Sequence, residues 1–100
     1  MSSFAIDGVR WNNDRVTHVR WGEIDELTAD WASVPKVVGV DHVVDALGKG
    51  ERVRTLFKLG GRIYLGPRVA AIPYANGHTG IEAVLEEDRV EKSLEDLPNI

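Results

Sequence analysis

Alternating apolar and polar residues near the start of the chain predict two β-strands joined by a polar turn. The strands cover residues 4–11 and 16–21, and the turn covers residues 12–15. An antiparallel register around this turn pairs Trp11 with Val16, Val9 with His18, Asp7 with Arg20, and Ile6 with Trp21. We therefore expect a β-hairpin with an ion pair between Asp7 and Arg20.

Both faces of this hairpin are expected to be partly apolar. In the predicted register one face carries Phe4, Ile6, Val19 and Trp21, and the other carries Val9, Trp11 and Val16. A small curled sheet or barrel needs apolar side chains on both sides. Gly8 is a candidate position for a bulge at which the first strand bends.

A loop and a short helix are predicted next. Residues 22–35 have no clear period, and Pro35 ends any regular element there, so we expect a loop with at most one helical turn. Residues 41–48 have the apolar spacing of a short helix, with Asp41 as its N-terminal cap. Gly48 or Gly50 supplies the left-handed residue that stops it.

Alternation returns after the helix. It predicts a strand over residues 51–59 with Val53, Thr55, Phe57 and Leu59 on one side and Arg52, Arg54, Leu56 and Lys58 on the other. Gly60-Gly61 and Gly66-Pro67 are expected to interrupt it, which leaves residues 62–65 as a very short strand or a structured loop. Asn76-Gly77 predicts a second hairpin, in which Pro73 lies at an edge or a bulge.

These elements predict one compact α+β domain over residues 1–85. Its curved antiparallel sheet or partial small barrel packs against the short helix. Residues 86–100 follow as an acidic C-terminal strap or tail, in which Val90, Leu94 and Leu97 have helical spacing. A second short helix, an ordered strap and an unstructured tail are all compatible with this segment.

Composition narrows the compartment and the chemistry. The chain is 43% hydrophobic and 28% charged, a globular balance, and it has no cysteine. Disulfides, thiolate zinc sites and cysteine nucleophiles are therefore excluded. No apolar run approaches the roughly 18 residues of a membrane span, and no signal-peptide pattern follows the first residues. We expect a cytoplasmic protein that does not act at a membrane.

Charge is unevenly distributed along the sequence. Residues 49–68 hold six Lys or Arg against one acid, whereas residues 82–100 hold two against seven. This excess predicts a basic strand surface formed by Arg52, Arg54, Lys58, Arg62, Tyr64 and Arg68. The alternative is a solvated hairpin face that the acidic C-terminal segment neutralises or covers.

No motif identifies a reaction. His18, His42 and His78 lie far apart, and none has the spacing of a zinc or calcium site. Gly48-Lys49-Gly50 lacks the residues of a phosphate-binding loop, and no serine lies in a nucleophile elbow. We therefore expect neither a metal nor a cofactor.

The sequence favours a non-enzymatic interaction module that uses the basic strand surface. We expect its partner to be an acidic protein segment, nucleic acid, or another copy of the chain that pairs through the edge near Pro73. Since the third option is self-association, we expect a monomer or a weak homodimer. One alternative is a single-stranded nucleic-acid binder, because Trp11, Trp21 and Tyr64 are interleaved with basic residues. Another is a small enzyme or ligand-binding domain that uses His18 with Asp7 and Arg20.

Several short motifs occur in a fixed order over most of the chain. They are residues 6–12 (IDGVRWN), 43–47 (VVDAL) with Gly50, 53–55 (VRT), 66–69 (GPRV), 76–77 (NG) and 97–98 (LP). With these motifs in this order, the chain resembles a small bacterial family, domain of unknown function 3892. The long segment 22–39 of this chain differs from the pattern of that family. The resemblance implies a bacterial or phage-associated cytoplasmic domain with no assigned activity, and it transfers no catalytic residue.

Overall fold

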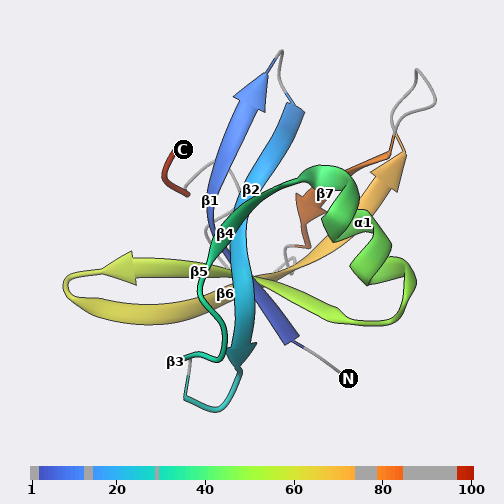
Figure 1. Ribbon diagram of the computed structural model, residues 1–100. Coiled ribbons are helices and arrows are strands. Elements are labelled where there is room, and N and C mark those ends of the chain that lie inside the picture. Colours follow the sequence, from blue (N-terminus) through green and yellow to red (C-terminus); the bar gives the residue numbers. More distant parts are fainter. Residues whose placement is uncertain (1–2, 13–14, 29, 74–78, 85–96) are drawn as a thin grey trace.

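The chain folds into a curved sheet with one helix in its concavity (Figure 1). The computed structural model describes residues 3–12, 15–28, 30–73, 79–84 and 97–100. The elements are β1 (Ser3–Asn12), β2 (Arg15–Asp25), β3 (Asp30–Trp31), β4 (Lys36–Gly39), α1 (Val40–Gly48), β5 (Arg52–Leu59), β6 (Arg62–Pro73) and β7 (Thr79–Ala83). The strands lie in the order β3-β2-β1-β5-β6-β7, and β4 pairs with the same edge of β2 as β3, away from β1. The predicted α+β class is thus confirmed in its broad form.

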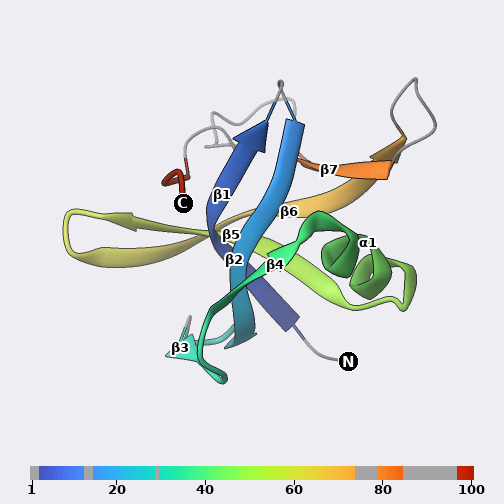
Figure 2. The same cartoon turned by 45° about the horizontal axis from the view of Figure 1, so that its top comes forward.

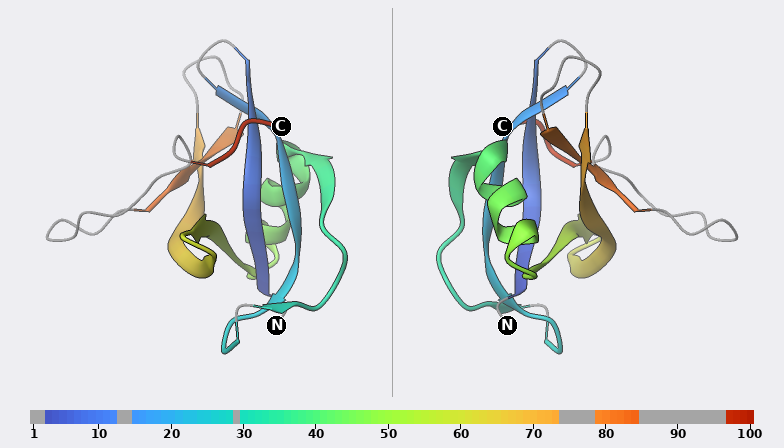
Figure 3. Two further views of the ribbon diagram at one scale, coloured as in Figure 1. Left: turned by 90° about the vertical axis from the view of Figure 1, so that its left-hand side faces the viewer. Right: turned by 90° about the vertical axis from the view of Figure 1, so that its right-hand side faces the viewer.

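The sheet is mixed, which corrects the antiparallel sheet expected from the sequence. β1 and β5 run parallel, with Ser3 opposite Arg52 and Ile6 opposite Thr55, whereas the other strand pairs are antiparallel. The sheet is open rather than closed into a barrel. Figures 2 and 3 show α1 between the layer of β1, β2 and β4 and the layer of β5, β6 and β7.

Apolar side chains pack on both faces of the sheet, as the hairpin pattern predicted. The main core lies on the side of α1 and contains Ile6, Val9, Val16, Val19, Trp21, Val43, Ala46, Val53, Phe57, Val69, Ile81 and Leu97. A smaller cluster contains Ala5, Ile24 and Leu56, with Trp31 and Leu65 packed against it. We call the side of the sheet with this smaller cluster the outer face.

Two bulges change the faces predicted for the first hairpin. The pairs Trp11 with Val16 and Ile6 with Trp21 are confirmed, but Val9 pairs with Val19 instead of His18. The register shifts after Ile6 and again after Arg10, because each strand contains one extra residue. Consequently Val9 and Val16, predicted for the opposite face, join Ile6 and Val19 in the main core.

The segment predicted as a loop, residues 22–35, contains the end of β2 and all of β3, and β4 follows directly after it. β2 continues to Asp25, β3 pairs with its end, and β4 pairs with its middle. These strands are only two and four residues long, and β4 places two valines side by side, so neither has a readable alternation. Pairing to β2 stabilises them instead of any local preference.

The helix confirms the prediction for residues 41–48, with one correction at its start. Gly39 is the N-cap residue and no side chain caps the helix, so Asp41 lies in the first turn. A carboxylate there still interacts favourably with the helix dipole. The stop is as predicted, because Gly50 has φ +82°.

β6 is continuous through Gly66-Pro67, where the sequence predicted an interruption. The turn at Gly60-Gly61 is confirmed, since both residues have positive φ (+58° and +80°). β7 pairs with the second half of β6, with Pro73 opposite Thr79. That pairing agrees with the second predicted hairpin, whose turn at Asn76-Gly77 lies outside the described residues.

The end of the chain pairs with β1. It occupies the edge of β1 that β5 covers only as far as Ile6. The Val9 N–H donates a hydrogen bond to the Pro98 carbonyl (3.0 Å), and the Ile100 N–H donates one to the Val9 carbonyl (2.9 Å). Leu97 is buried in the main core. Ile100 packs over Gly8, where a Cβ atom would lie 2.6 Å from its side chain. Residues 97–100 thus form an ordered strap, whereas the helix predicted before them falls outside the described residues.

Candidate interaction surface

The hairpin of β5 and β6 carries every residue of the predicted basic surface. Its base contains a bulge, because Arg54 pairs with Arg68 and Leu56 with Leu65, so that β6 has one more residue than β5 between these pairs. Gly66 occupies the bulge for a steric reason. A Cβ atom there would overlap the hydroxyl of Thr55 and lie 2.6 Å from the ring of Phe57.

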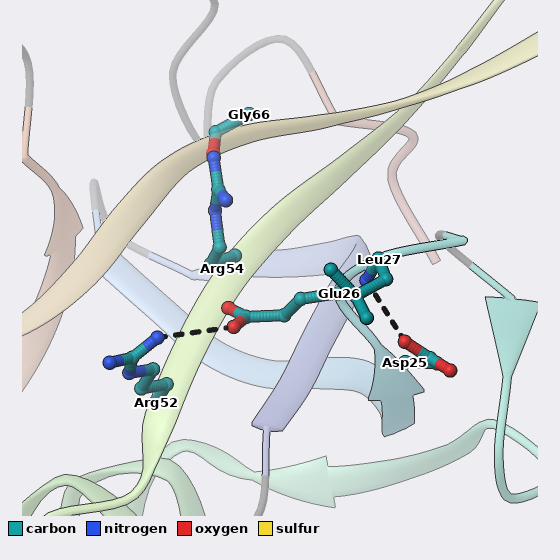
Figure 4. Close-up of polar contacts among 6 residues, drawn as sticks. All are labelled: Asp25, Glu26, Leu27, Arg52, Arg54 and Gly66. Carbon is teal, nitrogen blue, oxygen red and sulfur yellow. Dashed lines mark hydrogen bonds and ion pairs between the residues drawn. The ribbon is translucent and has the colours of Figure 1, made fainter.

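Side chains of β5 satisfy the carbonyl groups that this bulge frees. The Arg54 guanidinium donates two hydrogen bonds to the Gly66 carbonyl, from Nε at 3.1 Å and from a terminal nitrogen at 2.9 Å (Figure 4). The Thr55 hydroxyl, which is fully buried, donates one to the Pro67 carbonyl at 3.1 Å. Unpaired buried carbonyls would cost free energy, so Arg54 acts as part of the fold.

Arg52 also has a partner at the base. Its guanidinium lies 3.3 Å from Glu26 in the turn between β2 and β3, and Figure 4 shows both side chains crossing the outer face of the sheet. The Arg52 side chain is 64% exposed, so this ion pair adds little to stability. The ion pair nevertheless means that Arg52, the first residue of the predicted surface, already has an acidic partner in the same chain.

The other end of the hairpin extends away from the sheet. β1 pairs with β5 only as far as Thr55, and β5 continues to Leu59 beside β6 (Figure 1). We call residues 56–65 the ribbon. Ile63 and Tyr64 near its turn are 42% and 45% exposed, and Lys58 and Arg62 are exposed too. The ribbon tip therefore presents cations and large apolar side chains together to solvent.

The predicted basic surface is divided between the two faces of the hairpin. Residues that pair directly across two strands point to the same face, and neighbours along a strand alternate. Lys58 pairs with Ile63, so these two share the outer face, and Arg62 and Tyr64 lie on the opposite face. The bulge returns Arg68 to the outer face beside Arg54. Four of the six residues are thus together, and Arg62 and Tyr64 are separate from them.

The charge of the hairpin is of one sign. Residues 52–73 contain five Lys or Arg and no Asp or Glu. Within the described part of the chain, Arg52 has an ion pair, whereas Lys58, Arg62 and Arg68 have none. Exposed cations without an ion pair among the described residues are available to an anionic ligand, although the charge of Lys58 also acts on Asp7.

The structure brings together only two of the three residues considered for an enzymatic site. Arg20 Nε lies 3.7 Å from Asp7 Oδ1, which confirms the predicted ion pair. His18 lies beside Thr17, with 3.1 Å between Nδ1 and the hydroxyl, and its strand partners are Arg10 and Gly39. An imidazole placed there does not complete an acid–base pair with Asp7.

Asp7 is an unusual carboxylate at the junction of sheet and ribbon. Its side chain is only 8% exposed, and Oδ1 has no hydrogen-bond partner among the described residues. Burial raises the pKa of Asp7, and the positive charges of Arg20 and Lys58 oppose that rise.

A shallow cavity of about 210 Å³ lies beside α1. Its lining consists of Phe4, Trp21, His42, Asp45, Ala46, Lys49 and Glu51. The rings of Phe4 and Trp21 stack with centroids 4.5 Å apart. This cavity was not predicted from the sequence, although Asp45 and Lys49 follow His42 at three and seven residues, the spacing of one helix face. The lining contains both acidic and basic side chains, so its charge does not indicate which class of ligand would bind there.

The aromatic residues do not form a continuous platform. Trp21 is 7% exposed and stacked on Phe4, and Trp11 is 38% exposed near the far end of β1. Across the described residues, no three His, Cys, Asp or Glu side chains are placed to hold a metal ion, and no helix has the length and hydrophobicity to cross a membrane.

Comparisons of the chain with protein-family models, with curated proteins and with solved structures gave no match. The resemblance to the bacterial family therefore stays a prediction, and the function must be argued from the surface itself.

Proposed function

We propose that this protein is a non-enzymatic interaction module that binds an acidic partner through the tip of its ribbon. One observation carries the proposal. Lys58 and Arg62 are exposed beside Ile63 and Tyr64, on a hairpin that contains no acidic residue between positions 52 and 73. The proposal includes a cytoplasmic location, a monomer or weak homodimer, and no cofactor.

A merely solvated hairpin does not account for the tip. Such a hairpin would direct its apolar side chains inward, as Phe57 does with 6% exposure. Ile63 and Tyr64 instead remain more than two-fifths exposed. Tyrosine and arginine are enriched among the residues that dominate binding energy at interfaces, which supports a contact surface here.

The most direct test is elution from immobilised heparin, a generic polyanion, in a salt gradient. We expect the protein to be retained at low salt, and the double variant Lys58→Gln/Arg62→Gln to elute at clearly lower salt because it loses both exposed cations of the tip. The matched control is Lys36→Gln/Lys49→Gln, which removes the same charge from exposed sites outside the hairpin. Equal elution of the two double variants would contradict the proposal.

A further inference from the structure

The two faces of the ribbon tip carry the same combination of side chains. Lys58 and Ile63 are paired on the outer face, and Arg62 and Tyr64 lie on the opposite face. Each face thus presents one exposed cation and one exposed apolar or aromatic side chain. A flat partner would contact only one of these faces. A partner that uses both faces must surround the tip, as the two walls of a groove do.

The tip is narrow enough to enter such a groove. Gly60 and Gly61 form the turn without side chains, and both have positive φ. Two paired strands lie about 4.8 Å apart, so the backbone of the tip is narrow. The major groove of B-form DNA is about 12 Å wide and about 8.5 Å deep, and it admits a two-stranded ribbon.

We propose that the acidic partner is duplex DNA and that the ribbon tip enters its major groove, an inference that rests on the proposed function. Lys58 and Arg62 face the two walls of the groove, which are lined by the phosphates of opposite strands. Ile63 and Tyr64 contact the sugars and base edges between them. The backbone of Gly60-Gly61 approaches the floor of the groove.

The same observations disfavour the single-stranded nucleic acid considered from the sequence. Single strands are bound by several aromatic side chains on which successive bases stack. On the ribbon, Tyr64 is exposed, but Phe57 next to it across the strands is 6% exposed. Duplex RNA is disfavoured as well, because its major groove is deep and too narrow for side chains to read.

The inference is tested by fluorescence anisotropy with one labelled sequence in three forms: DNA duplex, single DNA strand and RNA duplex. We expect the protein to bind the DNA duplex about tenfold or more tightly than the other two. Two phosphate contacts give log Kd against log salt concentration a slope of about 2 in magnitude between about 50 and 200 mM salt.

Four variants locate the contacts. Lys58→Gln and Arg62→Gln should each weaken duplex binding and reduce the magnitude of the slope by about 1. Ile63→Ala and Tyr64→Ala should weaken binding by about fivefold or more with an unchanged slope, because no charge is lost. Lys36→Gln is the charge control and should retain the affinity and slope of the natural chain. Thermal unfolding of each variant verifies that it is folded.

The outcomes separate this inference from the proposed function. Tighter binding of the single strand or the RNA duplex overturns the duplex-DNA inference. Absence of duplex binding, with heparin elution still dependent on Lys58 and Arg62, overturns it too and leaves the proposed function in place. If replacing Lys58 and Arg62 also leaves the salt concentration of heparin elution unchanged, both proposals are contradicted.

Discussion

The base and the tip of the β5–β6 hairpin both carry basic residues but use them differently. At the base, Arg54 donates hydrogen bonds to the Gly66 carbonyl and Arg52 pairs with Glu26. At the tip, Lys58 and Arg62 have no ion pair among the described residues. A run of basic residues therefore does not define a binding surface by itself. The partners of each cation decide which of them stabilise the fold and which can reach a ligand.

The largest effect that this comparison predicts is at the base. Gly66→Ala should lower the free energy of unfolding by about 2–3 kcal/mol, because its Cβ would overlap the Thr55 hydroxyl and the Phe57 ring in a closely packed site. Urea denaturation measures the change. The matched control is Gly48→Ala at the end of α1, where a Cβ meets no atom within 4 Å. It should cost nothing, and equal losses in both variants would show that the bulge has no special steric constraint.

A pair of variants that each replace one cation by methionine contrasts base and tip directly. Arg54→Met should lower the free energy of unfolding by about 1–2 kcal/mol, because it leaves the Gly66 carbonyl unpaired. Lys58→Met should change it by no more than about 0.5 kcal/mol. Heparin elution should respond in the opposite order, with the larger shift for Lys58→Met. The division into base and tip is wrong if both variants lose the same stability.

The smallest expected effect is at the junction, where Asp7 lies near Lys58. Burial raises the pKa of Asp7, so its ionised form is less favourable in the folded state than in the unfolded state. The contribution of Asp7 to the free energy of unfolding is therefore fully present at low pH, where the carboxyl is protonated. It is lost as the pH rises through the raised pKa. Asp7→Asn should increase the free energy of unfolding at neutral pH by less than about 1 kcal/mol, since it also removes the ion pair with Arg20.

Urea denaturation of the natural chain and Asp7→Asn across a pH series checks this sign. The stability difference should shrink as the pH falls and the natural carboxyl becomes protonated. A variant that is less stable than the natural chain at neutral pH would show that the attraction of Arg20 and Lys58 exceeds the cost of burial.

Local patterns were sufficient to predict those elements whose signals lie within a few residues. Alternation and turn residues predicted the first hairpin, the start of β5 and the pairing of β6 with β7. Apolar spacing and Gly50 predicted α1. The parallel pairing of β1 with β5 could not be read in this way, because it joins residues about fifty positions apart through intervening strands and a helix.

The bulges are the main reason why some side chains lie on the face opposite to the predicted one. One extra residue exchanges the faces of every later side chain in a strand, and nothing in the alternation around Asp7 or Thr17 marks their position. Gly66-Pro67 predicts an interruption because glycine and proline together are typical of turns. In the structure the pair lies at a bulge of a continuous strand, where Arg54 and Thr55 of the neighbouring strand donate hydrogen bonds to the Gly66 and Pro67 carbonyls.

The sequence was sufficient to predict which residues are basic on this hairpin, but not which face each of them occupies or which of them have internal partners. Charge counting identified Arg52, Arg54, Lys58, Arg62 and Arg68 together. Only the register and the bulge show that Arg62 lies on the face opposite Arg68, and only the hydrogen bonds show that Arg54 is engaged.

The most direct test of the central claim compares two arginines in one experiment. In a protein labelled with ¹⁵N, the Nε–H signals of Arg54 and Arg62 are followed while a heparin fragment is added. We predict that the Arg54 proton exchanges slowly with water and keeps its chemical shift, because it is bonded to the Gly66 carbonyl. The Arg62 proton should exchange rapidly and shift on binding. A shift confined to Arg54, with Arg62 unaffected, would contradict the account.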